Sequence, residues 1–204
     1  MRPRSADKEQ AIRTRALQLI REEGLENLSM QKLAKAAGIS PRTIYLKYKD
    51  KEDLLIRLFI EEVLRAYEAA VLEGFDPAQS FETGVQQIWK NAWGYLTANR
   101  EAFALMQYGK SSPLLNKAYQ ERGIQEGQFF APIHQFLTQH IQAGHIRPFP
   151  VPVYRALLFA PLFELINEDF ERADRKEPPF PPALLDDVCE SLIGGMLMDG
   201  GGKL

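Results

Sequence analysis

Side chains that could contact nucleic acid are concentrated in one short segment of the chain. This segment carries Arg42, Thr43, Tyr45, Lys47 and Tyr48, which supply a guanidinium, an ammonium and three hydroxyl groups. Such groups hydrogen-bond to base edges in the major groove of DNA and to backbone phosphates. The sequence contains no phosphate-binding glycine loop, no nucleophile elbow and no paired acid motif. We therefore expect a nucleic-acid contact here, and no catalytic residue, cofactor or enzyme activity.

Two short helices are predicted to position these side chains. Ser29 is a good N-cap for a helix over 30–37, and Ser40 caps a second helix that begins at Pro41. Gly38 lies between them and can adopt the positive φ that a sharp turn needs. The small core beneath the helices is supplied by Leu33, Ile39 and Ile44, and close helix crossing is permitted by Ala34 and Ala37. The pattern predicts a helix-turn-helix, which places its second helix in the major groove in DNA-binding proteins but also occurs as a plain helical corner.

The segment around these helices is similar to the DNA-binding domain of the TetR family of bacterial regulators. Between about residues 11 and 58, the positions typical of that family are occupied without a gap by Gly24, Ser29, Leu33, Ala34, Ala37, Gly38, Ile39, Ser40, Thr43, Ile44, Tyr45, Tyr48, Lys51, Glu52 and Leu54. Two departures are mild: Tyr48 stands where phenylalanine is commoner, and Lys47 where histidine is frequent. The resemblance implies a dimeric regulator, usually a repressor, that binds double-stranded DNA.

The resemblance also assigns roles to individual residues. Thr43 and Tyr45 match positions that contact phosphate or base edges. Tyr48 matches an aromatic residue that closes the small core near the DNA backbone, and Lys51 matches a lysine that meets phosphate. Arg42 can either pair bidentately with guanine or contact phosphate alone. Helix starts present free N–H groups to phosphate, which adds the starts at Ser29 and Ser40. The complete set of expected DNA contacts is Ser29, Ser40, Arg42, Thr43, Tyr45, Lys47, Tyr48 and Lys51.

Helical periodicity dominates the rest of the sequence, with no convincing alternating strand, so the predicted fold is all-α. Asp50 caps a fourth helix that runs to about Leu72, and Pro132 should kink or split the segment 114–143. Further helices are expected over about 78–98, 100–109, 114–143, 151–171 and 182–199. We place a DNA-binding domain at 1–51, a connecting helix at about 51–73, and a ligand-binding and dimerisation domain at 74–204.

Charge is unevenly distributed along the chain. Residues 1–51 carry twelve Lys and Arg against six Asp and Glu, whereas the rest carries 13 against 21 within a total of −2. A positive lobe on an acidic body fits contact with phosphate at one end, although such clusters also arise by chance. The single cysteine, Cys189, fits a reducing compartment. With no signal sequence and no apolar run of the ~20 residues that span a bilayer, we expect a cytoplasmic protein that does not contact a membrane.

Aromatic residues are frequent beyond residue 75 and suggest a small hydrophobic or aromatic effector. The expected wall of its pocket is Trp89, Trp93, Phe103, Met106, Tyr108, Phe130, His134 and Phe163. Aromatic residues at helical spacing are more often simply core, so a regulator that binds DNA constitutively, with no ligand, is the alternative. His134 and His140 are six residues apart and face different sides of a helix, so no metal site is expected.

The last two long helices are expected to form a homodimer interface as a four-helix bundle. Their apolar residues are Val153, Leu157, Leu158, Leu162 and Leu165 on one helix, and Leu185, Val188, Leu192, Ile193 and Leu197 on the other. Gly194 and Gly195 would permit the close approach of a partner backbone. The alternative is that these helices cap the core of a monomer. Cys189 lies on the second of them and is read as a buried structural thiol rather than a redox sensor.

Overall fold

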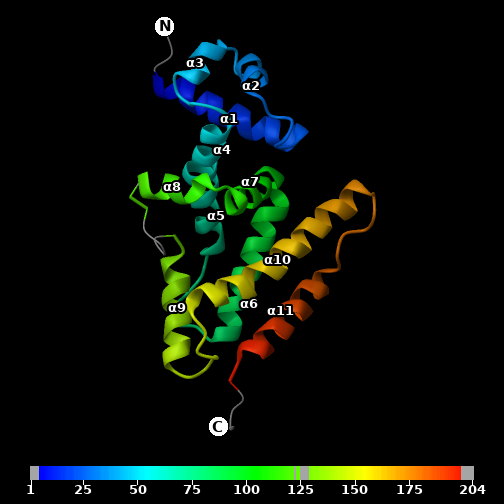
Figure 1. The fold of residues 1–204 in the computed structure, drawn as a ribbon. Helices are drawn as coiled ribbons and strands as arrows, with labels where there is room; N and C mark the ends of the chain where they lie inside the picture. The colour runs from blue at the N-terminus through cyan, green and yellow to red at the C-terminus, as the bar shows by residue number, and fades with distance from the viewer. Residues whose placement is uncertain (1–4, 122, 125–128, 199–204) are drawn as a thin grey trace. The chain divides into compact units, whose positions relative to one another are not determined.

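The computed structural model of the 204-residue chain describes residues 5–121, 123–124 and 129–198 (Figure 1). The residues described form helices and one isolated β-bridge, between Ile146 and Leu197, and no strand. The all-α prediction is therefore confirmed. Within the same residues, no helix is long and apolar enough to cross a membrane.

The chain divides into two compact units. The first combines Met1–Tyr67 with Ala98–Gln125, and the second combines Glu68–Thr97 with Glu126–Leu204. The predicted division into 1–51, a connecting helix over about 51–73, and 74–204 stays a prediction, and in the structure Ala98–Gln125 joins the N-terminal helices in the first compact unit. One contact within this unit joins the two segments. The Arg21 guanidinium donates to both carboxylate oxygens of Glu101, at 2.8 and 2.7 Å, although the two residues are 80 positions apart in sequence.

The first unit contains the helix-turn-helix and the helices that support it. Its elements are α1 (Ser5–Glu23), α2 (Met30–Ala36), α3 (Pro41–Tyr45), α4 (Lys51–Leu58), the π-helical turn η1 (Phe59–Val63), α7 (Arg100–Ser111) and α8 (Leu114–Glu121). The core buries one face of α1, with Ile12 and Ala16 fully inaccessible to solvent. Phe59 packs directly over Gly109 of α7, where a methyl group would lie only 2.9 Å from its ring.

The predicted fourth helix is interrupted by this π-helical turn. Helical residues run from Lys51 through η1 and α5 (Leu64–Val71), close to the predicted end at about Leu72. Asp50 caps the start, since its Oδ1 accepts from the backbone N of Asp53 at 2.8 Å. A π-turn needs i→i+5 bonding, which hydrophobic periodicity does not reveal.

The second unit packs α6 (Phe81–Ala98), α9 (Ala131–Gln142), α10 (Val151–Asp174) and α11 (Pro182–Met196) around an aromatic core. The Phe81 and Phe136 rings stack with centroids 5.9 Å apart. Gly84 makes room for Phe136, because a Cβ at that position would lie 2.4 Å from its ring. Helices α10 and α11 form a hairpin (Figure 1). The predicted 114–143 helix is split into α8 and α9, and Pro132 lies in the first turn of α9, where proline is tolerated.

Candidate nucleic-acid interface

Serine caps define the two helices of the helix-turn-helix. The backbone at Ser29 and Ser40 is extended, and each Oγ accepts from the backbone N three residues on, at 3.2 Å in both helices. Gly38 turns the chain between them at φ +65°, and the N–H of Ile39 donates to the carbonyl of Ala34 at 3.0 Å. The two caps and the glycine turn predicted from the sequence are confirmed.

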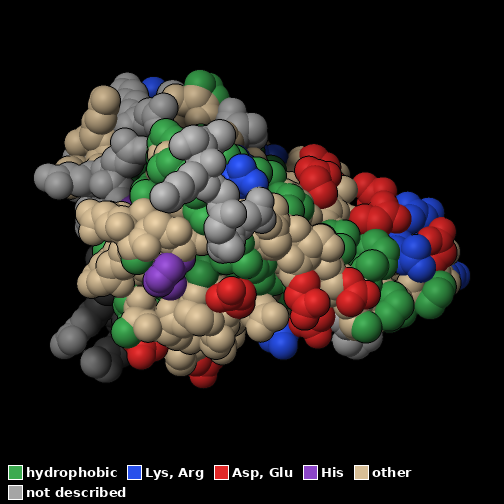
Figure 2. Space-filling model, turned by 90° about the horizontal axis from the view of Figure 1, so that it is seen from below, with side chains coloured by type: hydrophobic (Ala, Val, Ile, Leu, Met, Phe, Trp, Pro, Cys, Tyr) green, Lys and Arg blue, Asp and Glu red, His purple; other side chains and the backbone are tan. Residues whose placement is uncertain are grey.

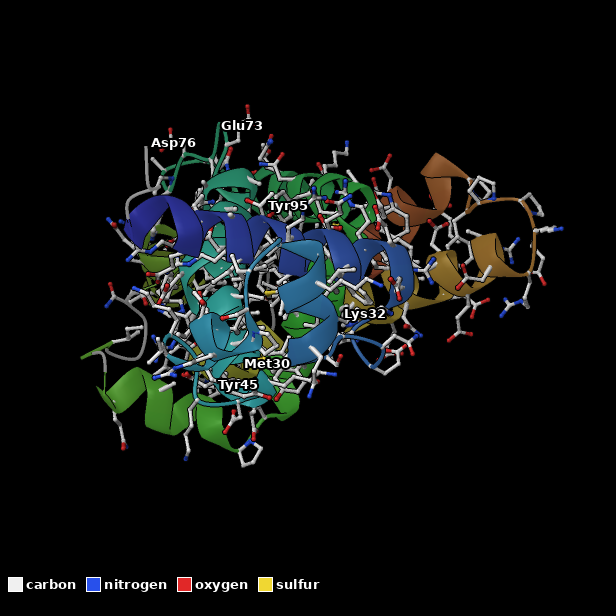
Figure 3. The ribbon with its side chains drawn as sticks, turned by 90° about the horizontal axis from the view of Figure 1, so that it is seen from above. Met30, Lys32, Tyr45, Glu73, Asp76 and Tyr95 are labelled. Carbon is white, nitrogen blue, oxygen red and sulfur yellow. The ribbon has the colours of Figure 1, made fainter. Side chains whose placement is uncertain are left out.

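Helix α3 presents an exposed face beyond its buried Ile44. Arg42 is exposed, Tyr45 is 48% exposed, and Leu46 immediately after the helix is 77% exposed. Thr43 is half-buried, and its Oγ1 lies 2.9 Å from the Ser40 hydroxyl. Viewed from above, Tyr45 and Lys32 mark the adjoining α3 and α2 (Figure 3). The face combines a guanidinium, hydroxyl groups and an apolar side chain, which is the mixture that reads base edges and thymine methyl groups.

Leu46 was missed in the sequence because every expected DNA contact was chosen for a charged or hydrogen-bonding side chain. With five residues, α3 turns too briefly to bury it, and Ile44 is the buried residue of that helix. A leucine this exposed is a candidate for apolar contact with a base. Its position directly after Tyr45, an expected DNA contact, was the sequence signal that could have identified it.

Several cations at this surface already have intramolecular partners. Lys47 Nζ lies 3.2 Å from Glu9, Lys51 Nζ donates to the carbonyl of Glu26 at 3.2 Å, and Lys32 pairs with Glu23. These exposed contacts are weak and can be exchanged for phosphate. Arg42 has no acidic partner within the described part of the chain, so its guanidinium is available without such an exchange.

Tyr48 lies in the core and not on the surface. It is 1% exposed, and burial raises the pKa of its phenol. The Arg57 guanidinium lies 5.5 Å from its ring centroid. A direct DNA contact by Tyr48 was therefore wrong, because its side chain is covered by protein, whereas the expected closure of the small core by this residue is what the structure shows.

Arg13 of α1 connects this small core to η1. Its guanidinium lies 2.8 Å from Glu9, 2.6 Å from Glu61 and 2.7 Å from Glu62. Burial opposes its charge, but hydrogen bonds with Glu62 and Glu9 outweigh that effect and raise its pKa. The same bond with Arg13 lowers the pKa of Glu9. Since Glu9 also pairs with Lys47, the network links α1, η1 and the end of the recognition helix.

The residues predicted to form one effector pocket are divided between the two units. Phe103, Met106 and Tyr108 belong to α7 of the first unit. The other five belong to the second unit: Trp89, Trp93, Phe130, His134 and Phe163. Trp89 is fully buried, and Trp93 is the one predicted residue that lines the cavity described next. Of the eight predicted wall residues, one therefore lines this cavity, and the predicted effector wall stays a prediction.

A cavity of about 230 Å³ lies within the second unit, among α6, α10 and α11. It is lined by Lys90, Trp93, Leu165, Phe180, Pro181, Leu184, Leu185 and Asp186. Lys90 and Asp186 pair at 3.4 Å, and both side chains are about half exposed. The charges thus lie at the rim, and the wall is apolar.

Two family profiles match the chain on either side of its connecting helix. Residues 12–58 match bacterial regulatory proteins of the tetR family, and residues 81–180 match a tetracyclin repressor-like C-terminal domain. The chain belongs to the TetR family. The first match contains the capped helix pair and the exposed face of α3, so the TetR-type DNA-binding domain coincides with the site described above.

Individual TetR-family relatives agree with this assignment. An HTH-type transcriptional regulator of Haemophilus influenzae is 34% identical over 55% of this chain and 60% of its own length, so that alignment spans about three fifths of the relative. The fatty acid metabolism regulator protein of Bacillus subtilis is 28% identical over 89% of this chain and 91% of its own. The Bacillus subtilis regulator FadR, solved in complex with stearoyl-CoA, shares the fold with a TM-score of 0.70 and 24% identity, over 92% of this chain and 98% of its own.

The family assignment makes the chain a helix-turn-helix transcription regulator and not an enzyme. TetR-family regulators bind DNA and typically act as dimers.

Proposed function

We propose that the protein is a cytoplasmic, homodimeric repressor that binds a palindromic operator and is released from it by a small, largely apolar effector. The observation that carries the DNA-binding part is the exposed face of α3, with Arg42, Tyr45 and Leu46 held outward by a short, capped helix. A symmetric dimer presents two such helices to successive major grooves, which is why a palindrome is the expected operator. Ser40, Thr43, Lys47 and Lys51 are proposed to contact phosphate beside this face, together with Ser29 at the start of α2.

Helices α10 and α11 are the proposed dimer interface. Apolar side chains remain accessible on both, including Val153, which is 39% exposed, and the half-buried Leu157, Val188 and Leu192. A methyl group at Gly194 or Gly195 would meet nothing within 4 Å, so a partner backbone can approach there. Burying well over ~1,000 Å² in total would give an obligate dimer.

The effector is proposed to bind the second unit. Its cavity among α6, α10 and α11 has an apolar wall, which suits an uncharged or weakly polar group. The Bacillus subtilis relative is a fatty acid metabolism regulator, and the Bacillus subtilis regulator FadR was solved with stearoyl-CoA, so stearoyl-CoA is a compound to test beside small hydrophobic molecules. An effector can release DNA only through unequal affinity for two conformations of the protein.

The decisive experiment selects operator fragments from random DNA with the full-length protein and measures binding across salt concentrations. We expect a palindromic consensus, and an affinity that falls steeply with salt as counterions are released. Light scattering should give twice the 23.2 kDa of one chain. Selection of no consensus, or a monomer at micromolar concentration, would contradict the proposal.

A constitutive regulator without a ligand is the second candidate. The small size of the cavity, about 230 Å³, favours it, because pockets for drug-sized ligands usually span about 300–1,000 Å³. The two candidates differ in one measurement. Stearoyl-CoA and a set of small hydrophobic compounds should release the operator fragment from a ligand-responsive repressor, and leave the complex of a constitutive one intact.

A further inference from the structure

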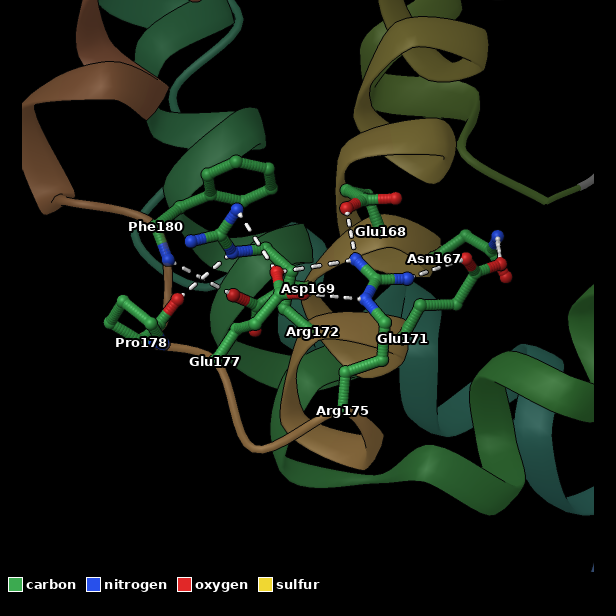
Figure 4. A network of polar contacts seen from close by, with 9 residues as sticks. All are labelled: Asn167, Glu168, Asp169, Glu171, Arg172, Arg175, Glu177, Pro178 and Phe180. Atoms are coloured by element: carbon green, nitrogen blue, oxygen red, sulfur yellow. Dashed lines mark hydrogen bonds and ion pairs between the residues drawn. The ribbon is translucent and has the colours of Figure 1, made fainter.

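The loop that joins α10 to α11 is held as a cap beside the cavity of the second unit. Arg172 of α10 donates from Nε to the carbonyl of Pro178 at 2.9 Å, and its guanidinium lies 5.0 Å from the centroid of the Phe180 ring. The backbone N of Phe180 donates to Asp169 Oδ1 at 3.3 Å. Figure 4 shows these contacts converging on the loop. Phe180 is therefore held from α10 while it also lines the cavity.

A second arginine fixes the start of the same loop. Arg175 contacts Glu168 at 2.7 Å, Glu171 at 3.3 Å and Glu177 at 2.9 Å (Figure 4). Each exposed pair contributes little to stability, but together they orient one short segment. The loop also contains Pro178, Pro179 and Pro181, whose fixed φ leaves the backbone few alternatives. The cap is thus ordered before any ligand arrives, which lowers the entropy lost on binding.

The size and lining of the cavity define what it can hold. An apolar cavity of about 150 Å³ accommodates benzene, so about 230 Å³ leaves room for one or two fused rings. Trp93 and Phe180 offer aromatic rings, against which another ring can pack edge-to-face or offset. The lining charges, Lys90 and Asp186, already pair with each other at the rim, so a charged ligand would have to displace one of them.

We propose that the partly open cavity lined by α6, α10, α11 and the Phe180 loop binds a small uncharged aromatic molecule of one or two rings. Leu165 and Leu184 form part of the apolar wall, and Phe180 is held in place on the loop side of the site. The effect of this binding on the operator complex rests on the proposed function, since α10 and α11 are also the proposed dimer helices. The binding itself does not depend on DNA.

The test uses the full-length protein with fluorobenzene and 1-fluoronaphthalene as probes. The chain has two tryptophans, so a ¹H–¹⁵N spectrum contains two indole N–H signals, assigned with Trp93→Phe. We expect the Trp93 signal to shift saturably while the signal of the fully buried Trp89 stays in place, and the ¹⁹F line of the probe to broaden. Absence of a Trp93 shift at probe saturation, or a shift of Trp89 alone, would overturn the inference.

Two filling variants separate this cavity from general hydrophobic binding. Leu184→Phe should weaken probe binding by roughly tenfold or more, because the larger side chain would take up part of the space that the probe needs. Leu165→Phe, on α10, provides the same test if the first variant folds poorly. Ala183→Phe is the matched control, since Ala183 is exposed and outside the lining. Equal weakening in Ala183→Phe and in both filling variants would contradict the site.

Operator binding is measured on the same preparations. Protein that binds its operator but neither probe would refute this site and leave the proposed DNA-binding function intact. Protein that binds the probes but no operator would refute the proposed function and retain the site.

Discussion

Arg13 of α1 and Glu62 of η1 form a 2.7 Å ion pair across 49 residues of sequence. The pair joins the helix that underlies the recognition helix to the π-helical turn of the connecting helix. Glu61, the adjacent residue of the turn, contacts the same guanidinium. Two successive acidic residues thus converge on one cation, and the turn is held to the helix-turn-helix by charge as well as by packing.

Replacing this cation should destabilise the first unit. Arg13→Ala leaves three carboxylates close together in a half-buried position, and we expect a loss of about 1–3 kcal/mol in the free energy of unfolding. Urea denaturation followed by circular dichroism measures it. Arg13→Lys keeps a positive charge among the carboxylates but loses the planar fork whose two terminal nitrogens make these contacts. Its loss in the free energy of unfolding should therefore be smaller than that of Arg13→Ala. An unchanged midpoint in the alanine variant would show that the network is not stabilising.

Tyr45 and Tyr48 should respond to truncation in opposite ways. Tyr45 is 48% exposed, so Tyr45→Ala should weaken operator binding by roughly 1–3 kcal/mol and leave the unfolding midpoint nearly unchanged. Tyr48 is buried, so Tyr48→Ala should cost about 3–5 kcal/mol of folding stability. Fluorescence anisotropy with an operator fragment and urea denaturation provide the two readouts. The division fails if Tyr45→Ala unfolds as readily as Tyr48→Ala.

Two glycines of α6 provide a matched pair for the core of the second unit. Gly84→Ala places a Cβ 2.4 Å from the Phe136 ring, and the forced movement should cost about 1–3 kcal/mol. Gly94→Ala meets nothing within 4 Å and should gain about 0.5–1 kcal/mol from helix propensity. Thermal unfolding should therefore shift down for the first variant and up for the second. Shifts in the same direction would contradict the packing.

Cys189 should be unreactive in the folded protein. Burial raises the pKa of its thiol to about 12, with a further contribution from Asp186. At pH 8 the folded chain holds almost no thiolate, so reaction with a disulfide reagent should be slow until denaturant is added. Because the unfolded thiol ionises near pH ~8.5 and the folded one near 12, the free energy of unfolding should fall as the pH rises between them. Rapid labelling of native protein at pH 8 would contradict the buried position.

Local sequence signals predicted the local structure well. Ser29, Ser40 and Asp50 act as caps through the short-range bonds that their side chains favour, and Gly38 adopts the positive φ expected of it. Pro132 marks the start of α9 for the same reason, since its missing N–H is tolerated in a first turn. These features depend on neighbours within a few residues, and the sequence displays those neighbours directly.

Features that depend on distant partners were not predicted. The contacts of Arg13 with Glu61 and Glu62, and the bond from Arg21 to Glu101, join helices that no spacing pattern connects. For the same reason, the sequence could not show which of the candidate effector residues lie in one unit. An aromatic residue such as Phe103 has the same sequence pattern whichever unit it packs in, so hydrophobicity could not separate core from cavity lining.

The sequence also did not predict which hydrophobic side chains are exposed on the surface. On the face drawn in Figure 2, hydrophobic residues are interspersed with acidic and basic ones. Tyr45, Leu46, Phe149, Val153 and Met198 are the large hydrophobic residues most exposed among those described. The first two flank the end of the recognition helix, and the other three lie in or next to the proposed dimer helices.

The burial of the lone thiol makes the protein convenient for distance measurements. A cysteine introduced at the exposed Ala36 of α2 would be the one position per chain that accepts a nitroxide label, with no need to replace the native residue. In a homodimer the two labels would report the separation of the DNA-binding helices by pulsed electron paramagnetic resonance. A change in that separation when an effector is added would measure directly how far the effector moves the two DNA-binding helices apart.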